Sequence, residues 1–351
     1  MLYHIASILV SHFGPIRLFM SYTVIIGLVL FTGFVATMMI LPRCYRKLPH
    51  DRGREFTQHA KDAQGKPTGA GFVFISIFVF ISIVFIPMNM LQIVIVLLTW
   101  FCMLTGYLDD RSEKGWGEYR KALLDLVICL IAAVAICFLR NEPLTFWFPF
   151  VTTEVVVSPI IFIPLATIIL WAMINTTNCS DGVDGLSATL VLWGLIFIGL
   201  ILYAILGHSQ ISAYLLVPHV SDGAGWATMA FAMAGVLMAY LWHNAYPSEV
   251  LMGDAGSRAL GFFTGVSILV TENPFLLLAT SSIILLNGGM GLLKVFLLRF
   301  FKIRIFSNIR FPLHDHVRER YHWSANQVLI KFFILQILVT LALAGIFLKI
   351  R

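Results

Sequence analysis

The amino-acid sequence predicts an all-α polytopic membrane protein with about ten transmembrane helices, and its composition and patterning both support this fold class. Hydrophobic residues make up 59% of the 351 positions, whereas charged residues make up only 12%. The mean hydropathy of +0.89 is too high for a soluble protein. A membrane-spanning helix needs about 20 apolar residues, so ten spans take about 200 positions, close to the whole hydrophobic fraction. We therefore expect residues 1–351 to form a single integral membrane domain.

The predicted spans are apolar runs of about 17 to 25 residues. In chain order they cover residues 21–42, 69–87, 90–108, 122–140, 158–175, 185–206, 225–243, 257–271, 275–298 and 327–348. The run at 257–271 is short and follows Pro247 and Gly253, while Gly288 and Gly289 interrupt the next run. Bent or broken helices are therefore expected at these two places.

The distribution of Lys and Arg among the loops predicts the orientation in the membrane. Seven, four and six of these residues lie in the segments 43–68, 109–121 and 299–325. The opposite side carries only Arg17, Arg140, Lys349 and Arg351. By the positive-inside rule the three basic loops face the cytoplasm, and ten spans then leave both termini outside. The first 20 residues show no small-residue cleavage site after an adequate apolar stretch, so we expect them to be retained.

Several function classes lack support in the sequence. The net charge of +6 comes without a basic, aromatic-interleaved domain, so we expect no nucleic-acid partner. The five cysteines are scattered, mostly within apolar runs, and form no CxxC pair, which indicates packing rather than metal or redox chemistry. P-loop, GxSxG and dinucleotide-binding fingerprints are missing, which argues against ATP hydrolysis, acyl-serine chemistry and nicotinamide chemistry.

Four polar clusters interrupt the apolar sequence, and all of them fall on the predicted cytoplasmic side. The first begins with Asp109-Asp110 at the end of a predicted span. Paired carboxylates at a membrane surface commonly bind Mg²⁺ together with a diphosphate. The alternative is a hydrated helix end near arginines, although carboxylates at a helix C-terminus oppose the macrodipole.

The second cluster is the turn NTTNCSDGVDG at 175–185, which contains Asn178, Asp181 and Asp184. Its two carboxylates are three positions apart, so one helical turn would bring them to one side. A helix-capping role for Asp181 is equally compatible with the sequence.

The third cluster, at 244–257, places Asp254 after Gly253 and before Ser257 at the start of a predicted span. Free backbone N–H groups at a helix start attract anions, and small neighbours let a phosphate or hydrated metal approach closely. A simple N-cap is the alternative for Asp254. Asn244, ten residues earlier, could be an ordinary loop amide.

The fourth cluster contains His314-Asp315-His316 among arginines at 310, 318 and 320. Guanidinium and imidazole groups suit recognition of a diphosphate. A zinc site would need three or four well-spaced ligands, and a basic loop touching acidic lipid headgroups is a further alternative. Lys294, inside an apolar run, is either a site residue or a side chain that extends to the interface. Taken together, these residues fit Mg²⁺-assisted phosphoryl transfer on a membrane substrate.

Four strings in these clusters resemble the motifs of the polyprenyl-phosphate N-acetylhexosamine-1-phosphate transferases. They are YLDDRSEKG, NTTNCSDGVDGLSA, NAYPSEVLMGDAGSRALG and RIFSNIRFPLHDH, and their order and spacing match over nearly the whole chain. The PLHDH string is nearer to the muramoyl branch of this family than to its GlcNAc branch.

The resemblance implies roles for individual residues. Asp109 and Asp110 match the family's Asp-Asp pair, whose first member acts as a base or positions a phosphate, and Lys121 matches the lysine that follows. Asp254 matches the aspartate that binds Mg²⁺, which would be the cofactor, and His314 would be catalytic. The implied substrate-binding residues are Thr68, Lys121, Asn178, Asp181, Asp184, Asn244, Gly253, Ser257 and His316.

The sequence also departs from the family pattern. Asp315 stands at the middle position of a triple-histidine motif, Lys294 stands where a glutamine is expected, and GTPTMGG has become GKPTGAG. The loop before this string aligns only with a gap, so its substrate-binding lysine could be Lys61 or Lys66.

The resemblance implies that the chain transfers phospho-MurNAc-pentapeptide from UDP-MurNAc-pentapeptide to undecaprenyl phosphate in the bacterial cell membrane, giving lipid I and UMP. A GlcNAc-1-phosphate transferase would share the metal-site residues and is the first alternative. A secondary transporter is the second, although its carboxylates should lie near the bilayer midplane. The outward-facing apolar helices would permit a homodimer.

Overall fold

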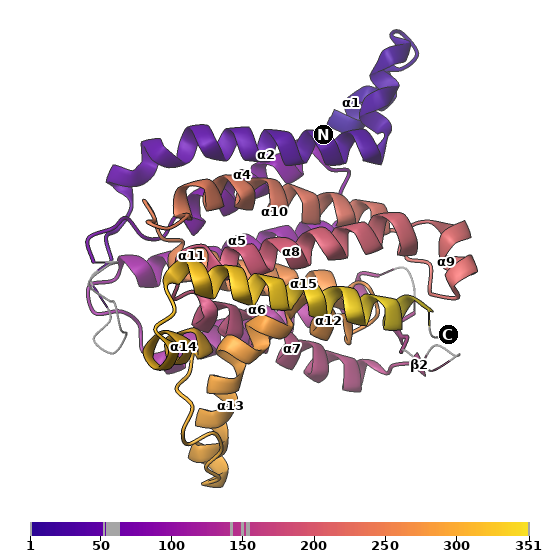
Figure 1. Ribbon diagram of the computed structural model, residues 1–351. Coiled ribbons are helices and arrows are strands. Elements are labelled where there is room, and N and C mark those ends of the chain that lie inside the picture. Colours follow the sequence, from indigo (N-terminus) through magenta and orange to yellow (C-terminus); the bar gives the residue numbers. More distant parts are fainter. Residues whose placement is uncertain are drawn as a thin grey trace.

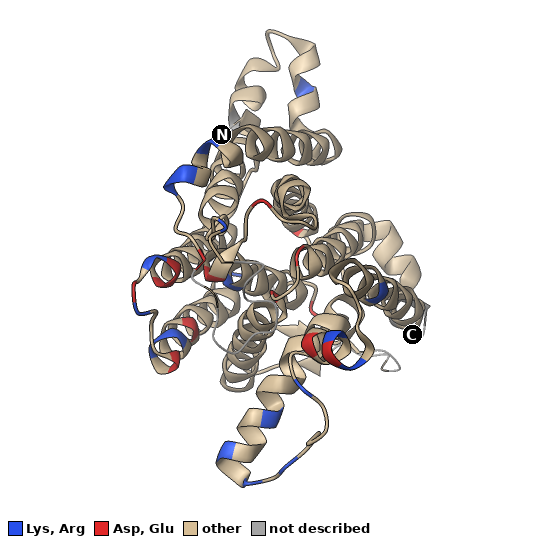
Figure 2. Ribbon diagram, turned by 60° about the vertical axis from the view of Figure 1, so that its left-hand side comes forward, with Lys and Arg blue, Asp and Glu red and all other residues tan. Residues whose placement is uncertain are grey.

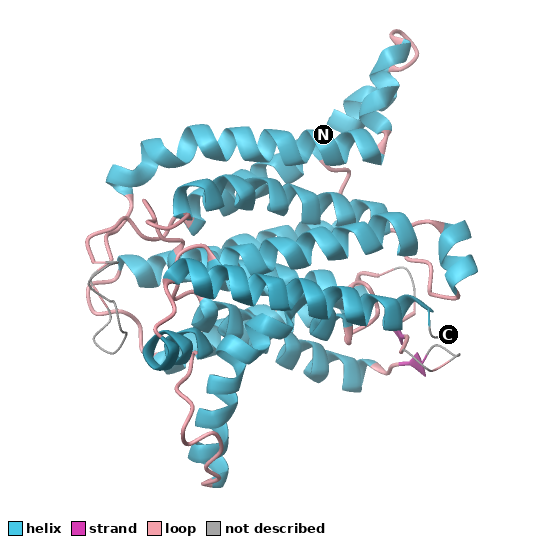
Figure 3. Cartoon of the chain, in the orientation of Figure 1, coloured by secondary structure: helices cyan, strands magenta, loops and turns pink. Residues whose placement is uncertain are grey.

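A computed structural model describes residues 2–51, 53, 64–140, 143–148, 151 and 155–349. The chain forms a bundle of long helices with one small hairpin (Figures 1 and 3). The long helices are α2 (Tyr22–Cys44), α4 (Gly71–Phe85), α5 (Met90–Arg111), α6 (Glu118–Phe138), α7 (Pro159–Ser180), α8 (Leu186–Leu200), α10 (Gly223–Asn244), α11 (Gly253–Leu269) and α15 (Ala325–Lys349).

Shorter elements extend or connect these helices. They are α1 (Leu2–Leu9), 3₁₀ turns at Gly14–Met20 and Tyr45–Lys47, a π-helical turn at Ile201–Leu206, α9 (Ser209–Leu215), α14 (Leu313–Tyr321), and the antiparallel strands β1 (Thr145–Phe146) and β2 (Val155–Val156). A broken helix comprises α12 (Leu276–Ile284), a π-helical turn at Leu285–Gly289, α13 (Met290–Phe296) and a second π-helical turn at Leu297–Phe301.

All ten predicted spans are helical in the structure. Within the described residues, eight helices are long and apolar enough to cross a membrane. The other two predicted spans correspond to α4, with 15 residues, and α11, with 17 residues. The all-α polytopic class is therefore confirmed. The five cysteines are free, in line with their scattered spacing.

Helix α11 is the central element of the bundle. Every residue from Asp254 to Leu269 is buried, and the helix packs against α4, α5, α7 and α8. Because its sides contact protein, α11 can carry charged residues that a lipid-facing helix could not. This also explains why apolarity alone placed the start of this span at residue 257, whereas the helix begins at Gly253.

The predicted interruption of the ninth span is confirmed. The helix changes to a π-helical turn at Leu285–Gly289, and α13 then leaves the bundle (Figure 1). A Cβ atom on Gly288 would lie 2.4 Å from the Thr176 carbonyl oxygen, so the glycine lets α7 approach this turn closely.

The loops that carry the four polar clusters gather at one end of the bundle, to the left in Figure 1. A view turned toward this end shows acidic and basic residues on the loops and helix ends (Figure 2). Helix α2 begins and helix α15 ends at the opposite end (Figure 1). The two termini of the bundle thus lie away from the candidate site.

Candidate active site

The candidate site is built around the first turn of α11. Gly253 has φ +67°, and a Cβ atom at this position would lie 2.3 Å from Asp110 Oδ2 and 2.8 Å from the Gly69 nitrogen. Backbone hydrogen bonds from Ala70 N to the Leu251 carbonyl at 3.1 Å and from Gly71 N to the Met252 carbonyl at 3.2 Å hold the start of α4 beside this turn. Glycine is required at position 253 for both its backbone conformation and the lack of space.

Asp110 binds the start of α11 from the end of α5. Its carboxylate accepts hydrogen bonds from the backbone nitrogens of Asp254 at 3.0 Å and Ala255 at 3.1 Å. Two of the N–H groups that a helix start leaves without an intrahelical partner are thereby satisfied by a side chain from another helix. Asp110 consequently fixes where Asp254 lies.

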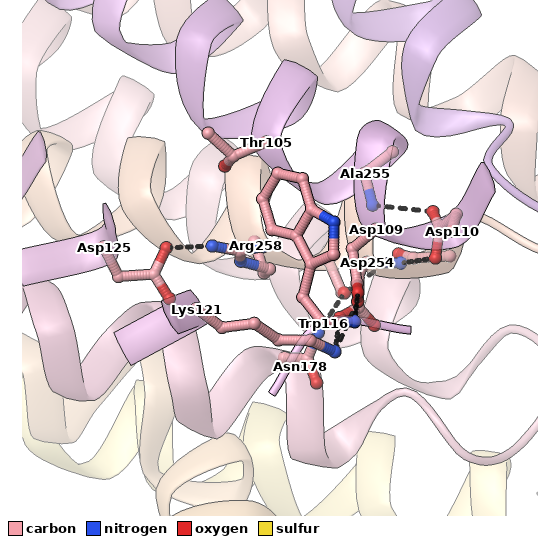
Figure 4. Close-up of polar contacts among 12 residues, drawn as sticks. Thr105, Asp109, Asp110, Trp116, Lys121, Asp125, Asn178, Asp254, Ala255 and Arg258 are labelled. Atoms are coloured by element: carbon pink, nitrogen blue, oxygen red, sulfur yellow. Dashed lines mark hydrogen bonds and ion pairs between the residues drawn. The ribbon is translucent and has the colours of Figure 1, made fainter. Parts of the chain in front are cut away.

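Asp109, Lys121 and Asp254 form a charged cluster that joins α5, α6 and α11 (Figure 4). The Lys121 ammonium pairs with Asp109 Oδ2 and with Asp254 Oδ2, the latter at 3.1 Å. The other Asp109 oxygen accepts the backbone N–H of Trp116 at 2.5 Å. Both aspartates are buried, while the Lys121 side chain is 30% exposed. Two carboxylates distant in sequence thus converge on one cation at the edge of the bundle.

Two further predicted residues lie on the next part of the same helix start. Asn178 Nδ2 donates to Ser257 Oγ at 3.1 Å, and Ser257 Oγ donates to the Gly253 carbonyl at 3.0 Å. These contacts bring the end of α7 to α11. The structure therefore places Asn178, Gly253, Asp254 and Ser257 together.

Asp184 and Asn244 lie beside this centre and bind neighbouring backbone. Asp184 Oδ2 accepts the backbone N–H of Ser248 at 3.0 Å and lies 3.8 Å from Lys66 Nζ. Asn244 accepts the Gly185 N–H and donates to the Val250 carbonyl, each at 2.8 Å. The two hydrogen bonds of Asn244 tie the turn after α7 to the loop before α11. The contacts of Asn244 are therefore those of a structural residue. Lys61 lies outside the described residues.

His314 is buried against the turn that follows α7. Its ring Nδ1 donates to Asn287 Oδ1 at 3.1 Å, and its backbone nitrogen donates to the same oxygen at 2.9 Å. Because a carbonyl oxygen can only accept, Nδ1 carries a proton. A Cβ atom on Gly182 would lie 2.3 Å from His314 Nε2, so Nε2 faces this turn. Asp315 is also buried, with Oδ1 3.7 Å from Nε2.

His316 lies on a different face of α14 and lines an open hollow. Its Nδ1 accepts the Arg310 N–H at 3.4 Å, and Lys294, Asn308 and Arg310 line the same hollow. Two positions along a helix differ by about 200°, which separates His316 from His314. Lys294 donates to the carbonyls of Phe306 and Ile309, each at 2.9 Å, and so fixes the chain after α13.

Thr68 and Asp181 border the centre. Thr68 is buried and its backbone nitrogen donates to Pro49 at 2.8 Å, one residue before the Gly69 nitrogen that lies beside Gly253. Asp181 is half-buried directly after α7, where its backbone nitrogen donates to the Asn178 carbonyl at 3.2 Å.

The ion pair between Asp125 and Arg258 was not predicted from the sequence; it lies one helical turn deeper in the bundle than Lys121 and Asp254. Arg258 Nη2 lies 2.5 Å from Asp125 Oδ1, and both residues are buried. A signal was present in the sequence, since Lys121/Asp125 and Asp254/Arg258 are opposite charges four positions apart within helical, apolar segments.

The donor set fits a hard divalent cation better than zinc. Among the described residues no group of three or more His, Cys, Asp or Glu side chains could enclose a metal ion. Mg²⁺ commonly uses one or two carboxylates together with substrate phosphates rather than a closed protein cage. Asp109 and Asp254, which converge on one cation, offer such an arrangement.

Known proteins match this chain over nearly its whole length. The family model of glycosyl transferase family 4 matches residues 92–272. A phospho-N-acetylmuramoyl-pentapeptide-transferase of Treponema pallidum subsp. pallidum is 54% identical over 348 residues, covering 99% of this chain and 96% of the relative. Proteins of the same name from Campylobacter curvus and Sulfurimonas denitrificans are 28% and 29% identical, covering 95% and 94% of this chain and 97% and 95% of the relatives. The family model spans Asp109 to Ser257, whereas Thr68, His314 and His316 fall outside its limits.

Proposed function

The chain belongs to glycosyl transferase family 4 and, within it, to the phospho-N-acetylmuramoyl-pentapeptide transferases, and from this premise we propose the reaction that it catalyses. A phosphate oxygen of undecaprenyl phosphate attacks the β-phosphorus of UDP-MurNAc-pentapeptide. The bond between this phosphorus and the oxygen that bridges to the α-phosphate breaks, so UMP leaves and lipid I forms. The relatives' names favour this donor over UDP-GlcNAc.

The observation that carries the proposal is the convergence of Asp109, Lys121 and Asp254 at the start of the buried helix α11. Phosphoryl transfer requires charge compensation and positioning more than covalent participation by the protein. The Lys121 ammonium can bind phosphate oxygens by charge-assisted hydrogen bonds, and His314 Nε2 faces the neighbouring turn. These groups can hold two phosphate-bearing substrates side by side.

Asp254, with Asp109 beside it, would hold Mg²⁺, which supplies compensation for the charge on the bridging and leaving oxygens. Asp109 itself is better suited to positioning than to proton abstraction. One of its oxygens already binds the Trp116 N–H and the other binds Lys121. A phosphate monoester has its second pKa near 6, so at neutral pH the attacking oxygen needs no strong base.

We propose that the end of the bundle that carries this site faces the cytoplasm of the bacterial inner membrane. The loops at this end contain most of the Lys and Arg residues of the sequence, and the positive-inside rule assigns such loops to the cytoplasm. UDP-linked substrates are cytoplasmic, which agrees with this orientation. Because Asp109 and Asp254 lie at helix ends rather than at mid-helix, the arrangement favours an enzyme over an ion-coupled transporter.

The test measures UMP release by detergent-purified protein with Mg²⁺ and undecaprenyl phosphate, comparing UDP-MurNAc-pentapeptide with UDP-GlcNAc. Turnover of the muramoyl donor alone, lost on adding EDTA and restored by Mg²⁺, is the expected result. Turnover of UDP-GlcNAc alone would contradict the proposed donor. Turnover unaffected by EDTA would contradict the metal assignment, and a folded protein inactive with both donors would contradict the proposed reaction.

A further inference from the structure

The Asp125–Arg258 ion pair joins α6 and α11 directly next to the proposed site. Its two side chains are only 2% and 3% exposed. Asp125 follows Lys121 by four positions on α6, and Arg258 follows Asp254 by four positions on α11, so each occupies the next turn of the same helix face. The two cross-helix pairs, Lys121–Asp254 and Asp125–Arg258, form a ladder with two rungs (Figure 4).

The charges in this ladder alternate. On α6 the cation Lys121 precedes the anion Asp125, and on α11 the anion Asp254 precedes the cation Arg258. Each charged group therefore has an opposite charge both across the helix interface and along its own helix. Charges interact strongly in a poorly polarisable interior, so sliding α6 against α11 would separate both pairs together.

Stability alone does not explain the Asp125–Arg258 pair. Arg258 is buried, yet its Nε and Nη1 atoms have no hydrogen-bond partner among the residues that the structure describes. A buried ion pair with unsatisfied groups commonly stabilises a protein no more than an apolar pair of similar volume. The pair instead fixes the relative position of the two helices along their axes. A hydrogen-bonded ion pair allows only one such position, whereas contacts between apolar side chains allow several.

We propose that Asp125 and Arg258 are positioning residues, whose ion pair fixes α6 against α11 and so holds the Lys121 ammonium between Asp109 and Asp254. Neither residue is assigned a contact with a substrate. The inference rests on the proposed function, because it takes Lys121 and Asp254 as the groups that bind phosphates and Mg²⁺.

The chain offers a matched control at the far end of the same two helices. Arg140, just after α6, pairs with Glu272, just after α11, and their side chains are 10% and 5% exposed. The end of α11 at Leu269, which precedes Glu272, lies about 22 Å from Asp254 along the helix axis, given a rise of 1.5 Å per residue. The Arg140–Glu272 pair should contribute to stability without influencing the geometry around Lys121.

The experiment compares R258M, the apolar double variant D125L/R258M and the control R140M/E272L with the parent protein. Melting temperature, kcat, KM for UDP-MurNAc-pentapeptide and the Mg²⁺ concentration for half-maximal rate are measured for each. R258M should have a lower melting temperature and a lower kcat than the parent, because the substitution leaves the Asp125 carboxylate buried without the Arg258 guanidinium. The double variant should have a melting temperature close to that of the parent. Its kcat should nevertheless be about ten- to a hundredfold lower than the parent's, and its Mg²⁺ concentration for half-maximal rate should be higher.

The control R140M/E272L should have a lower melting temperature than the parent. At a temperature at which it stays folded, its kcat and its Mg²⁺ concentration for half-maximal rate should be within about twofold of the parent's. A double variant with the parent's kcat and Mg²⁺ requirement would overturn the inference. If D125L/R258M does not fold, D125M/R258L replaces it with the same expectation. The rise in melting temperature on adding Mg²⁺ gives a readout without turnover. A parent that releases no UMP contradicts the proposed function, while an equal Mg²⁺-induced rise in parent and double variant contradicts the positioning role.

Discussion

The Asp110 carboxylate accepts the backbone N–H of Asp254 at 3.0 Å, across the interface between α5 and α11. The second aspartate of the YLDD string therefore binds backbone at the start of α11. Its second oxygen accepts the next backbone N–H, that of Ala255, so both of its oxygens bind the start of α11. Asp110 thereby acts as a helix cap that a different helix supplies, and it orients the residue proposed to bind Mg²⁺.

We predict that Asp110→Ala lowers both stability and turnover, whereas Asp110→Asn is milder because an amide oxygen still accepts one of the two hydrogen bonds. Loss of a helix cap costs about 0.5–2 kcal/mol, and release of the first turn of α11 should also displace Asp254. Thermal unfolding and UMP release of both variants test this. An alanine variant with the parent's melting temperature would show that the cap contributes nothing.

Asp254→Asn should abolish Mg²⁺-dependent turnover while the protein still folds. The amide keeps the volume of the carboxylate, and Lys121 retains Asp109 as a partner, but a neutral oxygen binds Mg²⁺ much more weakly. We expect at least about a hundredfold loss of UMP release at all Mg²⁺ concentrations, with expression and melting temperature close to the parent. Near-normal activity would refute the assignment of Asp254 as the metal ligand.

Lys121→Met should separate metal binding from catalysis. Without the ammonium, Asp109 and Asp254 would face each other with no cation between them, and this repulsion favours a divalent ion. Mg²⁺ should therefore raise the melting temperature of the variant more than that of the parent. UMP release should nevertheless fall, because a donor to the phosphates is gone. Unchanged turnover, or a smaller stabilisation by Mg²⁺ than in the parent, would argue against the cluster described for these residues.

The helices could be predicted from the sequence because each is a long apolar run, and a membrane imposes a length on such runs. The exceptions are polar helix ends: α6 begins at Glu118 rather than at residue 122, α7 ends at Ser180 rather than at 175, and α11 begins at Gly253 rather than at 257. The first turn of α11 is polar, and contacts with other helices stabilise it, among them the hydrogen bond from its Asp254 N–H to the Asp110 carboxylate. Local hydropathy contains no information about that environment.

The candidate site was predicted in part, because its residues occur in recognisable strings, but the contacts between the strings were not. Asp109 and Asp110 are neighbours in the sequence, but the structure directs the Asp109 carboxylate toward Lys121 and the Asp110 carboxylate toward the backbone of α11. Likewise, His314 and His316 lie two positions apart in one string, and α-helical geometry turns them to different faces.

This difference leads to a prediction for the two histidines. His314 is 2% exposed, hydrogen-bonded to Asn287 and packed against Gly182 in the turn that also carries Asp181, whereas His316 lines a separate hollow. His314→Ala should reduce kcat by about a hundredfold, within the range for losing a group that transfers a proton or stabilises charge.

Gly182→Ala should cause a similar loss, because its new methyl carbon would lie 2.3 Å from His314 Nε2 and must displace the ring. His316→Ala should change kcat by less than about threefold, as expected for a residue outside the reacting centre. UMP release by the three variants, compared at equal folded fraction from thermal unfolding, tests this order. A loss in His316→Ala as large as that in His314→Ala would mean that both imidazoles reach the same phosphates, which the two faces of α14 do not allow without rearrangement of the helix.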